Sequence, residues 1–135
     1  NISFENSIEI CNKLISSDCT KLINSDLISY YNTPGDLLKL INFADKNKIN
    51  LNDYDLKGFL SLLIDNNYYK KDDYIKDNIF LFIEMYFLML LSKSSYKNKI
   101  SFFYTKFINK VNNANKFNLD FESIFIEFKI NLLHE

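Results

Sequence analysis

The stretch Ala44–Asp55, ADKNKINLNDYD, has the length of a calcium-binding loop and lies between two runs of apolar residues at helical spacing. Such a loop needs oxygen ligands at positions 1, 3 and 5, a bidentate carboxylate at position 12, and glycine at position 6. Here positions 1, 3 and 5 hold Ala44, Lys46 and Lys48. Position 12 holds Asp55, and position 6 holds Ile49. Only the carboxylate at position 12 is present, and the ammonium groups of Lys46 and Lys48 stand where ligands of the cation would be. The sequence therefore predicts a loop that keeps this length without binding calcium.

Three other windows of the same length fit between or beside apolar runs. Two of them lack a usable ligand set, with Ile15, Ser17, Cys19, Thr20 and Asp26 in one and Asn112, Ala114, Lys116, Phe117 and Ser123 in the other. The third offers Asp73, Asp77 and Glu84, although Ile75 takes position 3. Weak ion binding there stays open beside a simpler interpretation, in which Asp73 and Asp77 offset the dipole at the start of a helix. We predict no metal site and no cofactor.

Catalytic chemistry is not indicated. No nucleophile–base pair and no glycine-rich phosphate loop is visible, and His134 stands alone next to the last residue. The net charge of −1 gives no basic footprint for nucleic acid, and sixteen lysines without an arginine offer no bidentate contact to phosphate. Cys11 and Cys19 could pair, but we favour a small core residue at Cys11 and a free thiol at Cys19. The sequence predicts a non-enzymatic protein.

The composition predicts an all-α fold. The 135 residues include only two glycines and one proline, whereas sandwiches and barrels need many tight turns. A polar residue, Pro34 and an acid at 32–36 predict a helix start, since proline suits the first helical position. The apolar run at 79–91 is too short to span a bilayer about 30 Å thick and predicts a buried helix. No signal peptide is visible, so we expect a cytoplasmic protein without membrane insertion.

An internal repeat links the two halves of the chain. Residues 44–51 (ADKNKINL) and 112–119 (NNANKFNL) align without a gap, and residues 19–31 align apolar on apolar with 48–60. In the twelve-residue windows the eighth position is apolar each time, with Leu22, Leu51, Phe80 and Leu119. Apolar residues also recur on the flanking helices. The chain thus repeats a unit of helix, short loop and helix.

This pattern resembles the calmodulin and myosin light chain family, which is built from pairs of EF-hands. The resemblance implies an all-α protein of two small lobes with degenerate calcium loops: an N-terminal lobe at 1–64, a linker at 65–78 and a C-terminal lobe at 79–135. It also implies that the eighth loop residues meet across a short β-bridge. Leu22 would then pair with Leu51 in the first lobe, and Phe80 with Leu119 in the second.

The length, the degenerate loops and the Asn/Lys/Ile bias are similar to those of essential light chains of apicomplexan gliding myosins. That resemblance implies a partner, the amphipathic neck helix of a myosin heavy chain, bound without calcium in a heteromeric motor complex near the parasite inner membrane. The light chain would stiffen the lever arm. The implied groove residues are apolar: Leu37, Leu40, Phe43, Leu56, Phe59, Leu60, Leu63, Met85, Met89, Phe103, Phe107 and Phe128.

Two alternatives remain. A viral Bcl-2-like inhibitor of apoptosis or innate signalling is also small and all-α, with an apolar central helix that residues 79–91 could supply, and it binds an amphipathic helix in a groove. However, the chain has no Trp-Gly-Arg motif, and that fold gives no reason for the repeat. An isolated four-helix bundle predicts no pairing of Leu22 with Leu51. A central helix surrounded by the others would favour the Bcl-2-like alternative.

Overall fold

The computed structural model describes residues 4–15, 23, 24, 27 and 34–133, and the regular structure within them is helical. The all-α prediction is confirmed for this part of the chain. The α-helices are α1 (Phe4–Ile15), α4 (Pro34–Lys46), α5 (Leu56–Asp65), α6 (Tyr68–Lys71), α7 (Asp73–Lys93), α8 (Lys97–Lys116) and α9 (Glu122–Phe128). A 3₁₀ turn, η1 (Leu51–Asp53), precedes α5, and a π-helical turn, η2 (Lys129–Leu133), follows α9.

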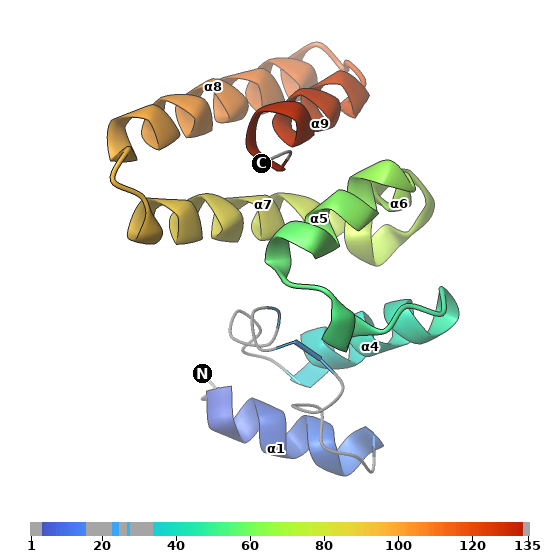
Figure 1. Cartoon of the computed structure of the whole chain (residues 1–135). Coiled ribbons are helices and arrows are strands. Elements are labelled where there is room, and N and C mark those ends of the chain that lie inside the picture. The colour runs from blue at the N-terminus through green and yellow to red at the C-terminus, as the bar shows by residue number, and fades with distance from the viewer. Residues whose placement is uncertain (1–3, 16–22, 25–26, 28–33, 134–135) are drawn as a thin grey trace.

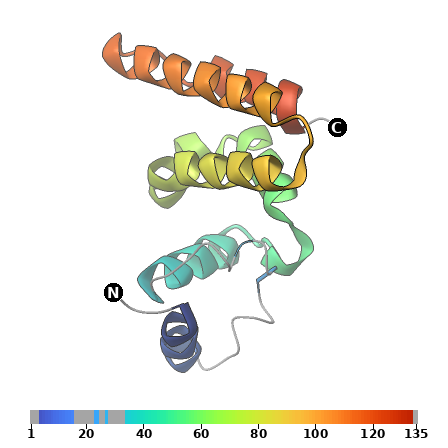
Figure 2. The same ribbon diagram turned by 90° about the vertical axis from the view of Figure 1, so that its left-hand side faces the viewer.

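The helices are stacked in layers: α1 lies at one end, followed by α4, then by α5, α6 and α7, and by α8 and α9 at the other end (Figures 1 and 2). The longest helix, α7, packs against α4, α5, α6 and α8. Among the described helices, α1 has its main packing against α4. The layer of α5, α6 and α7 therefore joins the two halves of the chain.

Side-chain caps set several helix starts. Pro34 opens α4, as the sequence predicts. Asp55 accepts a hydrogen bond from the Gly58 amide (2.7 Å) at the start of α5, and Asp72 accepts one from the Ile75 amide (3.2 Å) at the start of α7. These carboxylates satisfy amides that have no partner inside the helix. Asp55, the one ligand in the calcium-loop frame, thus serves as a helix cap.

A single hydrophobic core runs through these layers. The rings of Phe43 and Phe59 are 6.4 Å apart, and those of Phe59 and Phe82 are 5.3 Å apart, which links α4 to α5 and α5 to α7. Residues 65–78, which the sequence analysis assigns to a linker, contain α6 and the first turns of α7 and bury Tyr69 and Ile75. The division into lobes at 1–64 and 79–135 stays a prediction.

The third calcium-loop window, 73–84, is wrong as a loop because it lies wholly within α7. Phe80 projects from this helix and packs against Phe121 and Phe125, with ring centroids 5.5 Å away in each case. Leu119 is 58% exposed. The predicted core pair of Phe80 and Leu119 is therefore absent.

In the first half, Leu51 is a core residue, 3% exposed, as predicted. Its predicted partner Leu22 lies outside the described residues, as does Cys19. The Asn24 amide donates to the Leu51 carbonyl (3.2 Å), so the segment after Leu22 reaches the second loop. The loop pairing itself stays a prediction. Cys11 is fully buried, as predicted.

The sequence repeat corresponds to a structural repeat that is shifted by two residues. At the end of α4, the Ile49 amide donates to the Ala44 carbonyl (2.8 Å), and Lys48 has a φ of 56°. At the end of α8, the Leu119 amide donates to the Ala114 carbonyl (2.8 Å), and Asn118 has a φ of 55°. Both ends carry the 6→1 bond and left-handed residue of a Schellman motif.

The match continues into the following turns. The Asn50 side chain accepts a hydrogen bond from the Asn52 amide (3.1 Å), and the Asp120 side chain accepts one from the Glu122 amide (3.0 Å). Each is an Asx turn, in which the side chain accepts a hydrogen bond from the amide two residues later in the chain. Structurally, 44–52 therefore corresponds to 114–122, whereas the gap-free sequence alignment places 44–51 on 112–119.

Candidate functional site

Most of the residues that the sequence assigned to a partner groove lie inside the protein. The seven from the first half are 3% exposed or less: Leu37, Leu40, Phe43, Leu56, Phe59, Leu60 and Leu63. Met85 is also buried, and Met89 is half-buried against the core. These side chains hold the layers together. Of them, Phe43 also lines a shallow hollow of about 340 Å³ between α4 and the start of α7. In the structure they belong to the core or pack against it, and their role in a partner groove stays a prediction.

The three remaining predicted residues, Phe103, Phe107 and Phe128, come together between α8 and α9. They line a cavity of about 30 Å³, with Phe87 beneath them. Phe107 and Phe128 are 5.6 Å apart, ring centroid to centroid. A cavity of this size holds about one water molecule and cannot take a partner side chain. Phe103, however, also borders a much larger space.

That space, which we call the C-terminal groove, has a volume of about 510 Å³. Helix α7 packs against the other two helices that line it, α5 and α8. Its lining residues are Lys57 from α5, Tyr86, Leu90 and Ser94 from or just after α7, Tyr96, then Lys99, Ile100 and Phe103 from α8, and Asn131 and Leu132 from η2. The volume is in the range of ligand-binding clefts, about 300–1,000 Å³.

Turn η2 is held against the groove by several contacts. The Tyr86 hydroxyl donates to the Leu132 carbonyl (3.1 Å), which ties α7 to η2. Lys129 pairs with Asp65, which ties η2 to α5. Tyr86 also packs on Phe128, with ring centroids 6.1 Å apart. The groove is therefore formed by segments that the fold holds in fixed relative positions.

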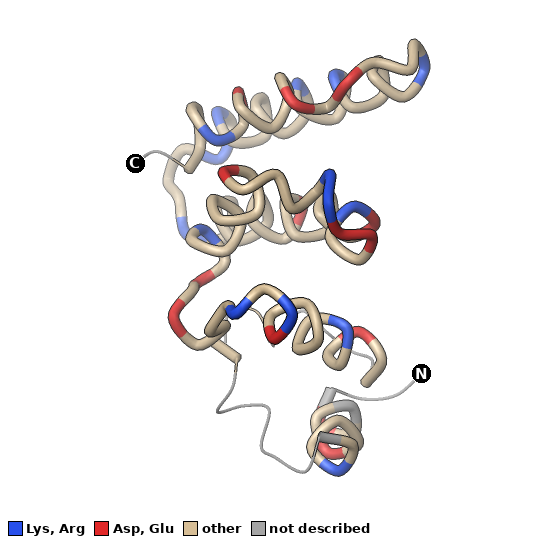
Figure 3. The backbone as a smooth tube through the Cα atoms, turned by 90° about the vertical axis from the view of Figure 1, so that its right-hand side faces the viewer, with Lys and Arg blue, Asp and Glu red and all other residues tan. Residues whose placement is uncertain are grey.

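The charged residues that line the groove are of one sign. Its two charged lining residues, Lys57 and Lys99, are both basic. Helix α8 carries five lysines and no acidic residue, and Figure 3 marks them in blue along its tube. Lys99 lies 5.9 Å from the ring centroid of Phe103. The groove thus combines an apolar lining with positive charge.

Glu127 of α9 neutralises part of the α8 charge farther along. It pairs with Lys110 and, at 3.6 Å, with Lys106. The hydrogen bond from Lys110 is the main cause that lowers the pKa of the Glu127 carboxyl. Because this side chain is 40% exposed, solvent screens the interaction. These pairs fix α9 on α8.

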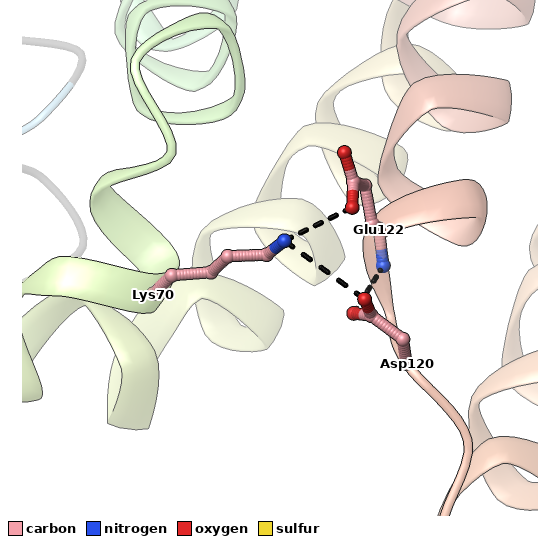
Figure 4. A network of polar contacts seen from close by, with 3 residues as sticks. All are labelled: Lys70, Asp120 and Glu122. Atoms are coloured by element: carbon pink, nitrogen blue, oxygen red, sulfur yellow. Dashed lines mark hydrogen bonds and ion pairs between the residues drawn. The ribbon is translucent and has the colours of Figure 1, made fainter.

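A second polar cluster joins α6 to the start of α9 (Figure 4). The Lys70 ammonium lies 3.0 Å from a Glu122 carboxylate oxygen and 3.9 Å from Asp120. The hydrogen bond to Glu122 is the main cause that raises the pKa of Lys70. Burial raises the pKa of the neighbouring Tyr69. Opposite charges satisfy each other here, so the cluster holds α6 and α9 together.

No metal centre is present among the described residues. Asp77 and Glu84 lie on one continuous helix, seven residues apart, which separates their Cα atoms by about 10 Å along the axis. Their carboxylates therefore do not converge on an ion with Asp73. Within the same residues, no helix is long and apolar enough to cross a membrane.

Sequence reasoning missed most of the C-terminal groove. Of its lining residues, only Phe103 was predicted, while the lysines Lys57 and Lys99 were not. One signal was available, because residues 97–116 alternate lysine with aromatic and aliphatic residues and contain no acid. No family model, curated protein or solved structure matches the chain.

Proposed function

We propose that this protein is a non-enzymatic binding module that holds an amphipathic helix of a partner protein in its C-terminal groove. The observation that carries the proposal is the groove itself: about 510 Å³ with a largely apolar lining between three helices and η2. A helix laid in such a cleft buries its apolar face and leaves its polar face in water. No ion is needed, because packing and ion pairs already hold the walls.

The partner that the sequence resemblance implies, the neck helix of a myosin heavy chain, is the first candidate for this groove. It would make the protein a calcium-independent light chain in a motor complex. The packing of α7 against α4, α5, α6 and α8 favours the alternative, a Bcl-2-like inhibitor with a central helix. Binding of an amphipathic helix is common to both proposals, and the class of partner distinguishes them.

The test uses the whole chain and two labelled peptides. One comes from a myosin neck helix, and the other is the amphipathic helix of a protein that promotes apoptosis. Fluorescence anisotropy is measured with calcium and with a chelator. We expect saturable 1:1 binding of one peptide at equal affinity in both buffers. Binding of neither peptide, or binding that the chelator abolishes, would contradict the proposal.

Two variants on α7 locate the site. Leu90 is half-buried and lines the groove, whereas Leu88 is 58% exposed and does not line it. We expect Leu90→Glu to abolish binding, because it places a charge in the apolar lining. Leu88→Glu is the matched control and is expected to bind normally. Circular dichroism confirms that both variants fold; the reverse pattern of binding would move the site to the other face of α7.

A further inference from the structure

We propose that a hollow between α6, α7, α8 and α9, which we call the aromatic hollow, binds a small uncharged molecule with one or two aromatic rings. Its lining comes from α6, the first turns of α7, the end of α8, the turn that follows α8, and α9, and its volume is about 390 Å³. Clefts that take small molecules have volumes of about 300–1,000 Å³. The aromatic hollow and the C-terminal groove share no lining residue among the described ones, so this inference goes beyond the proposed function.

Four aromatic side chains line the aromatic hollow and pack on one another. Tyr69 of α6 meets Phe125 of α9, with ring centroids 4.6 Å apart. The ring of Phe80 in α7 lies 5.5 Å from that of Phe125 and 5.5 Å from that of Phe121. An aromatic ligand extends this cluster through ring contacts, which stabilise aromatic pairs beyond the burial of their area. An aliphatic ligand of the same size gains burial alone, so the lining favours a flat aromatic molecule.

Contacts within the protein hold the walls of the aromatic hollow in place. The Lys70 ammonium lies 3.0 Å from a Glu122 carboxylate oxygen and 3.9 Å from Asp120, which joins α6 to the start of α9 (Figure 4). The ring contact of Tyr69 with Phe125 joins the same two helices. A ligand therefore does not have to order these walls, which lowers the free-energy cost of binding.

The charges of the lining balance. They belong to two lysines and two aspartates: Lys70, Lys76, Asp77 and Asp120. Lys70 is already paired with Asp120 and Glu122, so it is not available to a ligand. Lys76 and Asp77 are neighbours in the chain with opposite charges. A ligand with a net charge gives up hydration when it enters and meets no excess of the opposite sign, whereas an uncharged ligand avoids that cost.

Indole is the first probe of the aromatic hollow. It is uncharged, has two fused rings, and carries one N–H that can donate to the side-chain oxygen of Asn115 in the lining. Indole is titrated into the whole ¹⁵N-labelled chain, and the amide resonances are followed by NMR. We expect saturable binding with a Kd on the order of 1 mM or tighter, since a ligand of few atoms binds weakly. The largest shift changes are expected at residues 69–80 and 115–125.

Two results of this titration would overturn the inference. One is the absence of saturable binding, and the other is a set of shift changes that centres on the C-terminal groove. Either result leaves helix binding in the C-terminal groove untouched, because the two spaces have different lining residues.

Leucine substitutions test the ring contacts. Phe121→Leu removes one ring of the lining and keeps an apolar side chain. Phe102→Leu is the matched control, because Phe102 is 63% exposed on α8 and does not line the aromatic hollow. We expect Phe121→Leu to weaken indole binding about threefold or more, and Phe102→Leu to leave it unchanged. Circular dichroism checks folding; a folded Phe121→Leu variant that binds indole as tightly as the unmodified chain would refute the aromatic preference.

Charge variants test the balance at two exposed side chains, whose replacement does not disturb the core. Indole is compared with indole-3-carboxylate, an anion, and with tryptamine, a cation, and we expect indole to bind the unmodified chain most tightly. Asp77→Asn removes the carboxylate next to Lys76 and is expected to raise the affinity for indole-3-carboxylate about two- to fivefold. Lys76→Gln is expected to raise the affinity for tryptamine by a similar factor.

The matched control for these charge variants is Glu84→Gln, which is exposed farther along α7 and lies outside the lining. It is expected to leave the affinities for all three probes unchanged. A charged probe that binds the unmodified chain more tightly than indole does, or charge variants that behave like Glu84→Gln, would show that the aromatic hollow does not select uncharged ligands.

Discussion

Leu51 is 3% exposed in η1, and its carbonyl accepts a hydrogen bond from the Asn24 amide. Leu119 follows the end of α8 and is 58% exposed. The structural equivalent of Leu119 is Ile49, because both donate their amide to an alanine carbonyl five residues back. After α4, the side chain that enters the core belongs to Leu51, which follows Ile49 by two residues. Two leucines in similar local sequences therefore have different roles.

The difference predicts unequal effects of the same substitution. Leu51→Asp places a carboxylate in the core and is expected to lower the free energy of unfolding by at least about 3 kcal/mol. Leu119→Asp is expected to change it by less than about 0.5 kcal/mol, because the side chain is already in water. Urea denaturation followed by circular dichroism measures both. Equal losses would restore the equivalence that the sequence repeat suggests.

At the scale of the element, local chemistry explains what could be predicted. The helices around residues 37–43 and 56–63 were predicted from apolar spacing. The residues that start them, Pro34 at the first position of α4 and the cap Asp55 of α5, are local in sequence. The window 73–84 failed because loop length alone does not exclude a helix. The Asp72 cap starts α7 just before it, and the helix continues for 21 residues.

The shifted repeat leads to a prediction about helix ends. Lys48 and Asn118 adopt left-handed backbone conformations that cost an L-residue free energy, and Asn tolerates them better than Lys. We expect Lys48→Gly to stabilise the protein by about 0.5–1 kcal/mol, and Asn118→Gly by less. Lys46→Gly lies within α4 and is the matched control, expected to destabilise. Thermal denaturation gives the order; a loss at Lys48→Gly would contradict the Schellman assignment.

For the molecule as a whole, composition was sufficient to predict the fold class but not how the helices pack together. Few glycines and a single proline pointed to helices, and no local pattern specifies which helices meet. The C-terminal groove shows why, because Lys57 and Leu132 line the same space although they are far apart in the chain. Residues brought together only by packing leave no periodic signal around either position. The sequence therefore indicated at most the α8 side of the groove, through residues 97–116, and not its full lining.

The two-lobe interpretation and the continuous core make opposite predictions for Phe82. This ring is fully buried in α7 and lies 5.3 Å from Phe59 in α5, so it joins both halves. Phe82→Ala is expected to cost about 3–5 kcal/mol, and Phe82→Leu, the conservative control, clearly less. Amide hydrogen exchange locates the effect. If the core is one unit, protection falls together in α4, α5 and α8. Protection that falls only in α7, α8 and α9, with α4 and α5 unchanged, would mean that the first 64 residues fold as a separate lobe.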